Sequence, residues 1–225
     1  DRSIVGCFLS NELIDALPVH QIEIVDGKLQ EIYVTRNADG KLMEEIGELS
    51  TDRLQDYWQL NQINLLNGKY PDRYRTEVNL SALDWLTTGS EYVYSADRYY
   101  NPMRFQGTLQ CYYRHSYHND PYINIGNQDL TAHVDFTALQ NHGELLGLET
   151  FGFIQQGMLL MALGLGDRIA AISSSSGDLQ SLLSRRHNLH QLIDPMGLGK
   201  FGVLIQSKNL RSTEREISLK GLSIV

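Results

Sequence analysis

The stretch "GCFLSNELIDALPVH", residues 6–20, joins an apolar run to a polar one close to the first residue of the chain. Residues 4–9 are apolar without alternation, which is typical of a strand covered on both faces in a parallel sheet. The run ends on Ser10, Asn11 and Glu12. Open α/β sheets bind ligands in the crevice at the carboxyl ends of their strands, so these side chains are candidates for a binding site. The sequence therefore predicts an α/β fold.

The composition predicts a globular domain with a sizeable core. Apolar residues make up 42% of the 225 residues and charged residues 20%, a balance that is usual for such domains. The net charge of −8 argues against a broad phosphate-binding face, so we expect no nucleic-acid partner. The longest apolar stretch, residues 157–166, is well short of the roughly 20 residues that cross a bilayer, so we expect no membrane span.

Two segments stand out between residues 19 and 126. Residues 19–50 alternate apolar and polar positions around Asp-Gly pairs at 26–27 and 39–40. This pattern predicts consecutive hairpins that form a three-stranded antiparallel insertion. Residues 92–126 are rich in tyrosine and turn formers and show little periodicity. A loop of this length in a compact domain tends to be functional or disordered, and its aromatic content favours order.

Helical and strand patterns alternate through the rest of the chain. The predicted elements are a helix at 51–66, a strand leading into a helix at 73–86 with Asn79 or Ser81 as its cap, a helix at 131–143, a strand at 147–154, an apolar helix at 155–172, a polar connector at 173–178, a helix at 179–192 and a strand at 201–207.

A few side chains carry chemistry by their spacing. Glu12 and Asp15 are three residues apart, so they share a face if their segment is a helix rather than a turn. Two such carboxylates can clamp a guanidinium or act as acid and base, or they can simply cap a helix N-terminus. His133 and Asp135 alternate at the predicted start of a helix, where a structural histidine is the commoner outcome. The histidine pair in "HSYH", residues 115–118, lacks a third ligand at a recognisable spacing, so we expect no metal centre.

Two motifs relate the chain to a known family. At "SNELIDALPVH", residues 10–20, and more strongly at "GTLQCYYRHSYHNDPYINIGNQDLTAHVDFTAL", residues 107–139, the sequence resembles the MidA family of S-adenosylmethionine-dependent methyltransferases. The resemblance runs through nearly all 225 residues. This family includes the mitochondrial protein-arginine methyltransferase needed for complex I assembly. The resemblance implies a Rossmann-like class I methyltransferase sheet with a β-hairpin insertion and a helical subdomain.

The resemblance also implies roles for individual residues. "GCFLSNEL" resembles the fourth strand of such a sheet and the loop after it, which end beside the methyl group of the cofactor. Glu12 then corresponds to the glutamate that grips the substrate guanidinium in protein-arginine methyltransferases. The resemblance implies that Ser10 and Asn11 contact the cofactor, S-adenosylmethionine. It implies catalytic roles for Glu12, Asp15 and His133, and substrate contacts for Asp129 and Asp135.

Two departures from the family's pattern concern the cofactor. The glycine-rich loop and first strands of the family should precede Asp1, and no strand resembling "LTIDYGY" stands before "RYY", residues 98–100. We therefore expect the methyltransferase sheet to be incomplete in this chain. The chain alone should bind the cofactor weakly or not at all, unless a partner chain or the missing segment completes the site.

The resemblance implies a division of the chain and a function. Residues 1–18 and 141–210 belong to the methyltransferase core, residues 19–140 form an insertion that includes the Tyr-rich substrate side, and residues 211–225 are a polar tail. The expected function is methylation of arginine nitrogen on a protein substrate. The alternative is a non-catalytic binding or assembly module for a respiratory-complex subunit. A homodimer stays open, and the expected compartment is the bacterial cytoplasm or the mitochondrial matrix.

Overall fold

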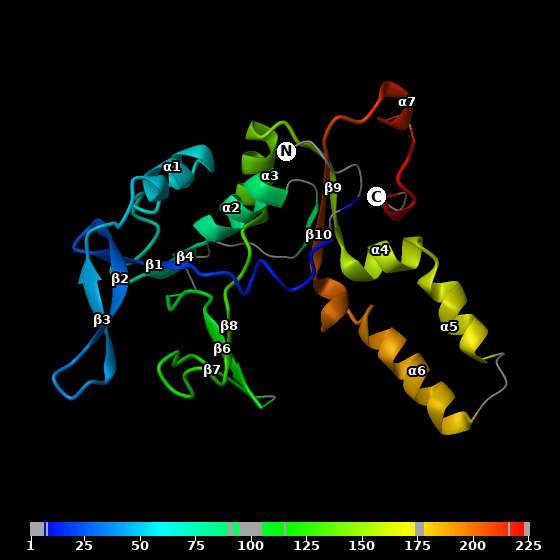
Figure 1. Cartoon of the computed structure of the whole chain (residues 1–225), viewed down its shortest axis with the longest axis horizontal. Coiled ribbons are helices and arrows are strands. Elements are labelled where there is room, and N and C mark those ends of the chain that lie inside the picture. The colour runs from blue at the N-terminus through cyan, green and yellow to red at the C-terminus, as the bar shows by residue number, and fades with distance from the viewer. Residues whose placement is uncertain are drawn as a thin grey trace.

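The computed structural model describes residues 7, 9–89, 92–94, 105–114, 116–173, 178–215 and 217–222. In this part of the chain, three small sheets and the helices around them make up the fold (Figure 1). The strand predicted at 4–9 lies almost entirely outside the described residues, and so do residues 95–104 of the Tyr-rich segment and most of the connector predicted at 173–178.

Sheet A has the strand order β3-β2-β1-β4. Its strands are β1 (His20–Val25), β2 (Lys28–Arg36), β3 (Leu42–Gly47) and β4 (Arg75–Val78). Asp26 and Gly27 form the tight turn between β1 and β2 with φ angles of 50° and 72°, which is the positive-φ pair that a type I′ turn requires. The predicted three-stranded antiparallel insertion is therefore confirmed.

The main core lies between sheet A and three helices. These are α1 (Arg53–Leu60), α2 (Leu80–Gly89) and α3 (Phe136–Leu145). Helix α1 is shorter than the predicted helix at 51–66, because Gln62 takes a left-handed φ of 54° that a helix cannot continue through. The most deeply buried apolar side chains of this core are Ile14, Ile22, Leu54, Val78, Leu86, Leu139 and Leu204.

Of the two predicted caps of α2, Asn79 and Ser81, the structure shows Asn79 in that role. Its side-chain Oδ1 accepts a hydrogen bond of 2.8 Å from the backbone N–H of Ala82, which would otherwise have no helical partner. Its Nδ2 donates a hydrogen bond of 2.9 Å to the carbonyl oxygen of Ile14. The same side chain therefore starts a helix and holds the segment that follows Ser10 against the core.

Helix α3 begins later than predicted. The predicted start at Thr131 is wrong, since residues 129–131 form a strand, β8 (Asp129–Thr131), that pairs with β6. The helix begins after Asp135, whose carboxylate accepts a hydrogen bond of 3.0 Å from the backbone N–H of Ala138 and one of 2.8 Å from the hydroxyl of Tyr57. Asp135 thus joins α3 to α1.

Replacing Asp135 by Ala is expected to lower the free energy of unfolding by about 2 to 3 kcal/mol, because a helix cap and a buried hydrogen bond are lost together. Asp178 is a matched control, since it caps α6 through the backbone N–H of Ser181 and is exposed. Replacing Asp178 by Ala should cost only about 1 kcal/mol. Urea unfolding of both variants measures the difference, and equal losses would contradict the added role of Tyr57.

Sheet B has the order β5-β10-β9, and all of its pairs are antiparallel. Its strands β9 (Glu149–Gln155) and β10 (Gly202–Ser207) match the predicted strands at 147–154 and 201–207, and β5 (Tyr92–Tyr94) adds an edge. The short elements after β10 are α7 (Ser212–Arg215) and the turn η2 (Lys220–Leu222).

The apolar helix predicted at 155–172 is two helices, α4 (Gln156–Ala162) and α5 (Leu165–Ser173). The single-helix prediction is wrong because Gly164, at a φ of 98°, breaks the helix between them. Helix α6 (Leu179–Gln191) agrees with the helix predicted at 179–192 and packs along α5, and the turn η1 (Leu198–Lys200) leads from it to β10. Figure 1 shows α5 and α6 projecting away from sheet B as a paired arm. No helix in the described ranges has both the length and the apolar character that a bilayer crossing needs.

Sheet C is a small antiparallel sheet in the order β7-β6-β8. It consists of β6 (Gln110–Tyr113), β7 (Ser116–His118) and β8, and it lies beside sheet A in Figure 1. An isolated bridge joins Arg75 of β4 to Gln106, just ahead of β6. Sheet C is therefore attached to the free edge of sheet A.

Candidate functional site

The segment that follows Ser10 is extended and turned, not helical. Residues 11–19 contain bends and a turn, so Glu12 and Asp15 do not lie on the face of a helix. Glu12 is exposed and has a left-handed φ of 49°, an uncommon conformation for a glutamate. Such backbone outliers cluster at binding sites, so its geometry supports a functional reading of this position.

Asp15 is half-buried and anchors this segment to a second one. Its carbonyl oxygen accepts a hydrogen bond of 2.9 Å from the backbone N–H of Ala132. Burial raises the pKa of the Asp15 carboxyl, against the effect of nearby backbone N–H groups. The structure therefore brings two predicted sites together, because His133 follows Ala132 directly.

A pocket of about 400 Å³ opens between sheets A and C beside His133. Its walls are largely polar. The side from sheet A includes Gln21, Glu44, Arg75 and Glu77, and the side from sheet C and its flanking residues includes Thr108, Gln110 and His133. Because hydrogen-bonding groups line both sides, the pocket suits a polar or charged side chain better than an apolar one.

Glu77 is the buried carboxylate at this pocket. Its side chain is in the interior, at 2% exposure, and it accepts hydrogen bonds from the backbone N–H of Thr108 at 2.9 Å, from the Thr108 hydroxyl at 2.8 Å and from the backbone N–H of Leu109 at 3.2 Å. The Thr108 hydroxyl in turn accepts a hydrogen bond of 3.0 Å from the backbone N–H of His133. A continuous chain of hydrogen bonds therefore runs from Glu77 to the backbone of His133.

The sequence prediction missed Glu77. It lies in a four-residue strand, and no spacing to another acid or histidine distinguishes it from a surface glutamate. In the structure Glu77 is marked by Gly107, at a φ of 74°, since a side chain there would run into the Glu77 carboxylate. A glycine required by a buried acid more than 25 residues away is visible only in three dimensions.

Burial raises the pKa of Glu77 above its ordinary value of 4.5, although its three donor groups oppose the shift. The folded protein therefore holds a proton on Glu77 more tightly than the unfolded chain does. The stability that this proton brings is complete below 4.5 and is lost as the pH rises through the folded pKa. Relative to a Glu77→Gln variant, the wild type should lose unfolding free energy as the pH rises above 4.5. Urea unfolding at several pH values checks this, and a constant difference would contradict it.

An ion-pair network closes the far side of the pocket. Glu23 is 1% exposed and binds Arg73 at 2.6 Å and Arg75 at 2.8 Å, and Arg75 also binds Glu44 at 2.8 Å. A buried carboxylate held by two guanidinium groups is costly to disturb. Arg75 is therefore a fixed wall of the pocket.

The structure places the remaining predicted residues in different surroundings. Ser10 is buried at 5% exposure, and Asn11 beside it is exposed. Asp129 is exposed on β8, and Asp135 lies at the start of α3 with both oxygens already bonded. Among the described residues, no three His, Cys, Asp or Glu side chains gather closely enough to bind a metal ion.

The hydroxyl of Ser10 shows whether the segment that begins there could contact a cofactor. Its hydroxyl is buried and has no hydrogen-bond partner among the described residues. A buried hydroxyl without a partner is costly, so a polar group normally meets it. S-adenosylmethionine carries hydroxyl, amino and carboxylate groups that could do so, and Ser10 therefore fits the cofactor contact that the sequence implies.

Comparisons with known proteins give consistent results. Residues 1–154 match the family described as "Putative S-adenosyl-L-methionine-dependent methyltransferase". The chain is 27% identical over 165 residues to the protein arginine methyltransferase NDUFAF7 homolog, mitochondrial, of Drosophila melanogaster. The matched region covers 68% of this chain and 36% of that protein. The Caenorhabditis elegans homolog is 27% identical over 194 residues, with 85% and 45% covered. The chain thus spans less than half the length of these curated relatives.

Two solved structures from Burkholderia thailandensis share the fold. One, a crystal structure with bound S-adenosyl-homocysteine, superposes with a TM-score of 0.78 at 25% identity and covers 94% of this chain and 54% of its own. The other, an uncharacterized protein, gives a TM-score of 0.77 at 26% identity and covers 97% and 59%. This likeness confirms the predicted methyltransferase fold.

Proposed function

We propose that this chain takes part in methyl transfer to arginine nitrogen on a protein. The premise is that the chain belongs to the family of S-adenosyl-L-methionine-dependent methyltransferases, which its first 154 residues match. The observation that carries the proposal is the family match, together with the fold shared with a protein bound to S-adenosyl-homocysteine. The arginine target is supported by the names of both curated relatives.

The cofactor side of the proposed site is the segment at Ser10 and Asn11. S-adenosylmethionine supplies an electrophilic methyl group on a sulfonium. The buried Ser10 hydroxyl would form one hydrogen bond with the cofactor, and the exposed Asn11 amide would form another.

The substrate side would be formed by Glu12, Asp15 and His133. Glu12 is an exposed carboxylate, so it is free to accept two parallel hydrogen bonds from a guanidinium, and this pairing would orient the nitrogen toward the methyl group. The Asp15 carbonyl oxygen accepts a hydrogen bond from the backbone N–H of Ala132, and the next residue, His133, lines the pocket. Both carboxylate oxygens of Asp135 accept hydrogen bonds from other residues of the chain. We therefore propose that Asp135 supports the segment of His133 and does not contact the substrate directly.

The partner and compartment belong to the same proposal. The partner is a protein that carries an accessible arginine, and a respiratory complex I subunit is the specific candidate. The names of the curated relatives support a mitochondrial setting if the source is eukaryotic, and the cytoplasm is the counterpart if it is bacterial.

Incubation of the full chain with radiolabelled S-adenosylmethionine and arginine-containing peptides tests the proposal. The expected result is label in methylarginine after acid hydrolysis of the peptide, and none in otherwise identical lysine peptides. Label in neither peptide would overturn the activity of this chain. Capture of a protein partner that persists without the cofactor would then favour the assembly-module alternative.

A further inference from the structure

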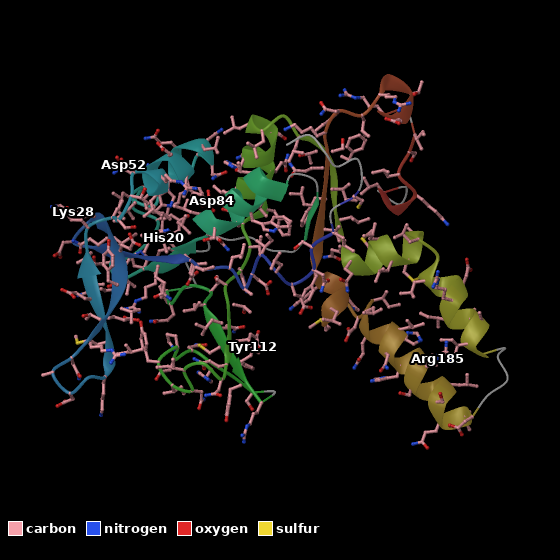
Figure 2. The ribbon with its side chains drawn as sticks, in the orientation of Figure 1. His20, Lys28, Asp52, Asp84, Tyr112 and Arg185 are labelled. Atoms are coloured by element: carbon pink, nitrogen blue, oxygen red, sulfur yellow. The ribbon has the colours of Figure 1, made fainter. Side chains whose placement is uncertain are left out.

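Three side chains of sheet C form a row across one face of the sheet. Tyr112 of β6 stands directly opposite Tyr117 of β7 and Asp129 of β8 in the strand registers. Residues directly opposite each other in antiparallel strands project from the same face, with neighbouring strands about 4.8 Å apart. Tyr112 is 42% exposed and Tyr117 is 70% exposed, and Asp129 is also exposed. We call these three residues the aromatic–acid row, and Figure 2 labels Tyr112 on sheet C.

The aromatic–acid row continues into the pocket. Side chains alternate along a strand, so Gln110 shares the face of Tyr112, and the Tyr112 hydroxyl donates a hydrogen bond of 2.9 Å to Gln110 Oε1. Gln110 lines the pocket together with Thr108 and His133. Along β8 the same face carries Asp129 and then Thr131, which pairs with Gln110. Two parallel lines of side chains therefore lead from the pocket to the row.

The groups of the row are available to a ligand. The Asp129 carboxylate makes no hydrogen bond or ion pair with any described residue, and the same holds for the Tyr117 hydroxyl. The nearest arginine in sequence, Arg114, lies over the ring of Tyr113, with its guanidinium carbon 5.1 Å from the ring centre. Tyr113 is adjacent to Tyr112 in the strand and so faces the opposite way. The guanidinium of Arg114 is therefore on the other face of sheet C.

We propose that the aromatic–acid row binds a lysine or arginine side chain of the protein substrate, a second basic residue beside the one that is methylated. Tyrosine rings attract cations through their faces, and the exposed carboxylate adds a charge partner, while the methylene stem of the basic side chain covers the rings. The net charge of −8 favours a basic partner in the same sense.

The geometry also predicts a spacing. Thr108 at the pocket and Tyr112 in the row are four residues apart, and an extended chain rises about 3.4 Å per residue, so the two subsites are separated by at most about 14 Å. An extended substrate covers this distance in about four residues. This inference rests on the proposed function for the identity of the pocket residue, but the binding of the second cation does not depend on it.

Fluorescence polarisation with two labelled peptides tests the row. Both peptides have a Gly-Ser-Ala background and one central arginine, and one of them carries a second arginine four residues away. With the full chain and no cofactor, the two-arginine peptide should bind about five- to tenfold more tightly than the one-arginine peptide. Asp129→Asn and Tyr117→Leu should each reduce this ratio toward one. Tyr117→Phe keeps the ring and should preserve the ratio, as should Asp39→Asn, which removes an exposed acid from the β2–β3 turn.

The outcomes separate this inference from the proposed function. Equal affinities of the two peptides for the wild type would overturn the proposal that the row binds a second basic residue. An unchanged ratio of the two affinities in Asp129→Asn and Tyr117→Leu would overturn it as well. If the wild type binds the two-arginine peptide more tightly but transfers no methyl group, the result would support binding by the row and contradict the enzymatic activity. Where methyl transfer occurs, Asp129→Asn should raise KM for the two-arginine peptide and leave kcat unchanged, which loss of fold would not produce.

Discussion

Methyl transfer by a Glu12→Gln variant is expected to be slower than that of the wild type by about 100- to 1000-fold, the usual cost of removing one charge-stabilising group from a reacting centre. Glutamine keeps the size of the side chain but removes its negative charge, so in the proposed site the guanidinium would lose its bidentate, charge-assisted partner. Glu12 is exposed and contributes nothing to the core, so the free energy of unfolding should change by less than about 0.5 kcal/mol.

Initial rates with saturating S-adenosylmethionine, together with urea unfolding, check both parts. Glu45→Gln is the matched control because Glu45 is also an exposed glutamate, on β3, and its replacement should leave the rate unchanged. A Glu12→Gln variant with the wild-type rate would remove Glu12 from the mechanism. An equal loss in both variants would point to a general effect of net charge.

The second large effect is expected at Gly107. Replacing it by Ala should lower the free energy of unfolding by about 3 to 5 kcal/mol, because a side chain at a positive φ is strained and the added methyl group meets a buried carboxylate. The φ of Gly107 is 74°, and the methyl carbon would lie against Oε1 of Glu77. Glu77 would have to move away from the Thr108 donor, which is buried with it, and from the partly buried Leu109 donor.

A comparison with Gly126 distinguishes the backbone strain from the contact with Glu77. Its φ is 77°, nearly the same as that of Gly107, but nothing lies within 4 Å of the position its side chain would take. Gly126→Ala should therefore show only the backbone strain, about 1 to 2 kcal/mol. Thermal and urea unfolding of the two variants give the comparison. Similar losses at both positions would mean that the Glu77 contact contributes little.

The parts of the fold that were predictable depend on short-range patterns. The turn at Asp26 and Gly27 and the cap at Asn79 are local devices, and each appears where the sequence places it. The late start of α3 could not be read in the same way, since Asp129 to Thr131 leave the helical pattern only because β6 is there to pair with them. The break at Gly164 has a local signal, a glycine, but the surrounding apolar run favours one continuous helix.

The candidate site shows the same division. Its members were predicted from a resemblance between motifs, and the structure adds that Asp15 and Ala132 are joined by a backbone hydrogen bond. Glu77 was not found, because its importance comes from burial and from partners about 30 residues further along the chain. Sequence patterns of period two or 3.6 carry no information about such contacts.

The pairing of the sheets has a consequence for the order of folding. Sheet A is built mostly from neighbours in the chain, because two hairpins with short turns bring β1, β2 and β3 together. Sheet B instead requires β5 to meet β10, which lies far along the chain, and this closure carries a larger entropy cost. Hairpins form in microseconds and non-local pairings much more slowly, so sheet A should become protected from hydrogen exchange before sheet B during refolding.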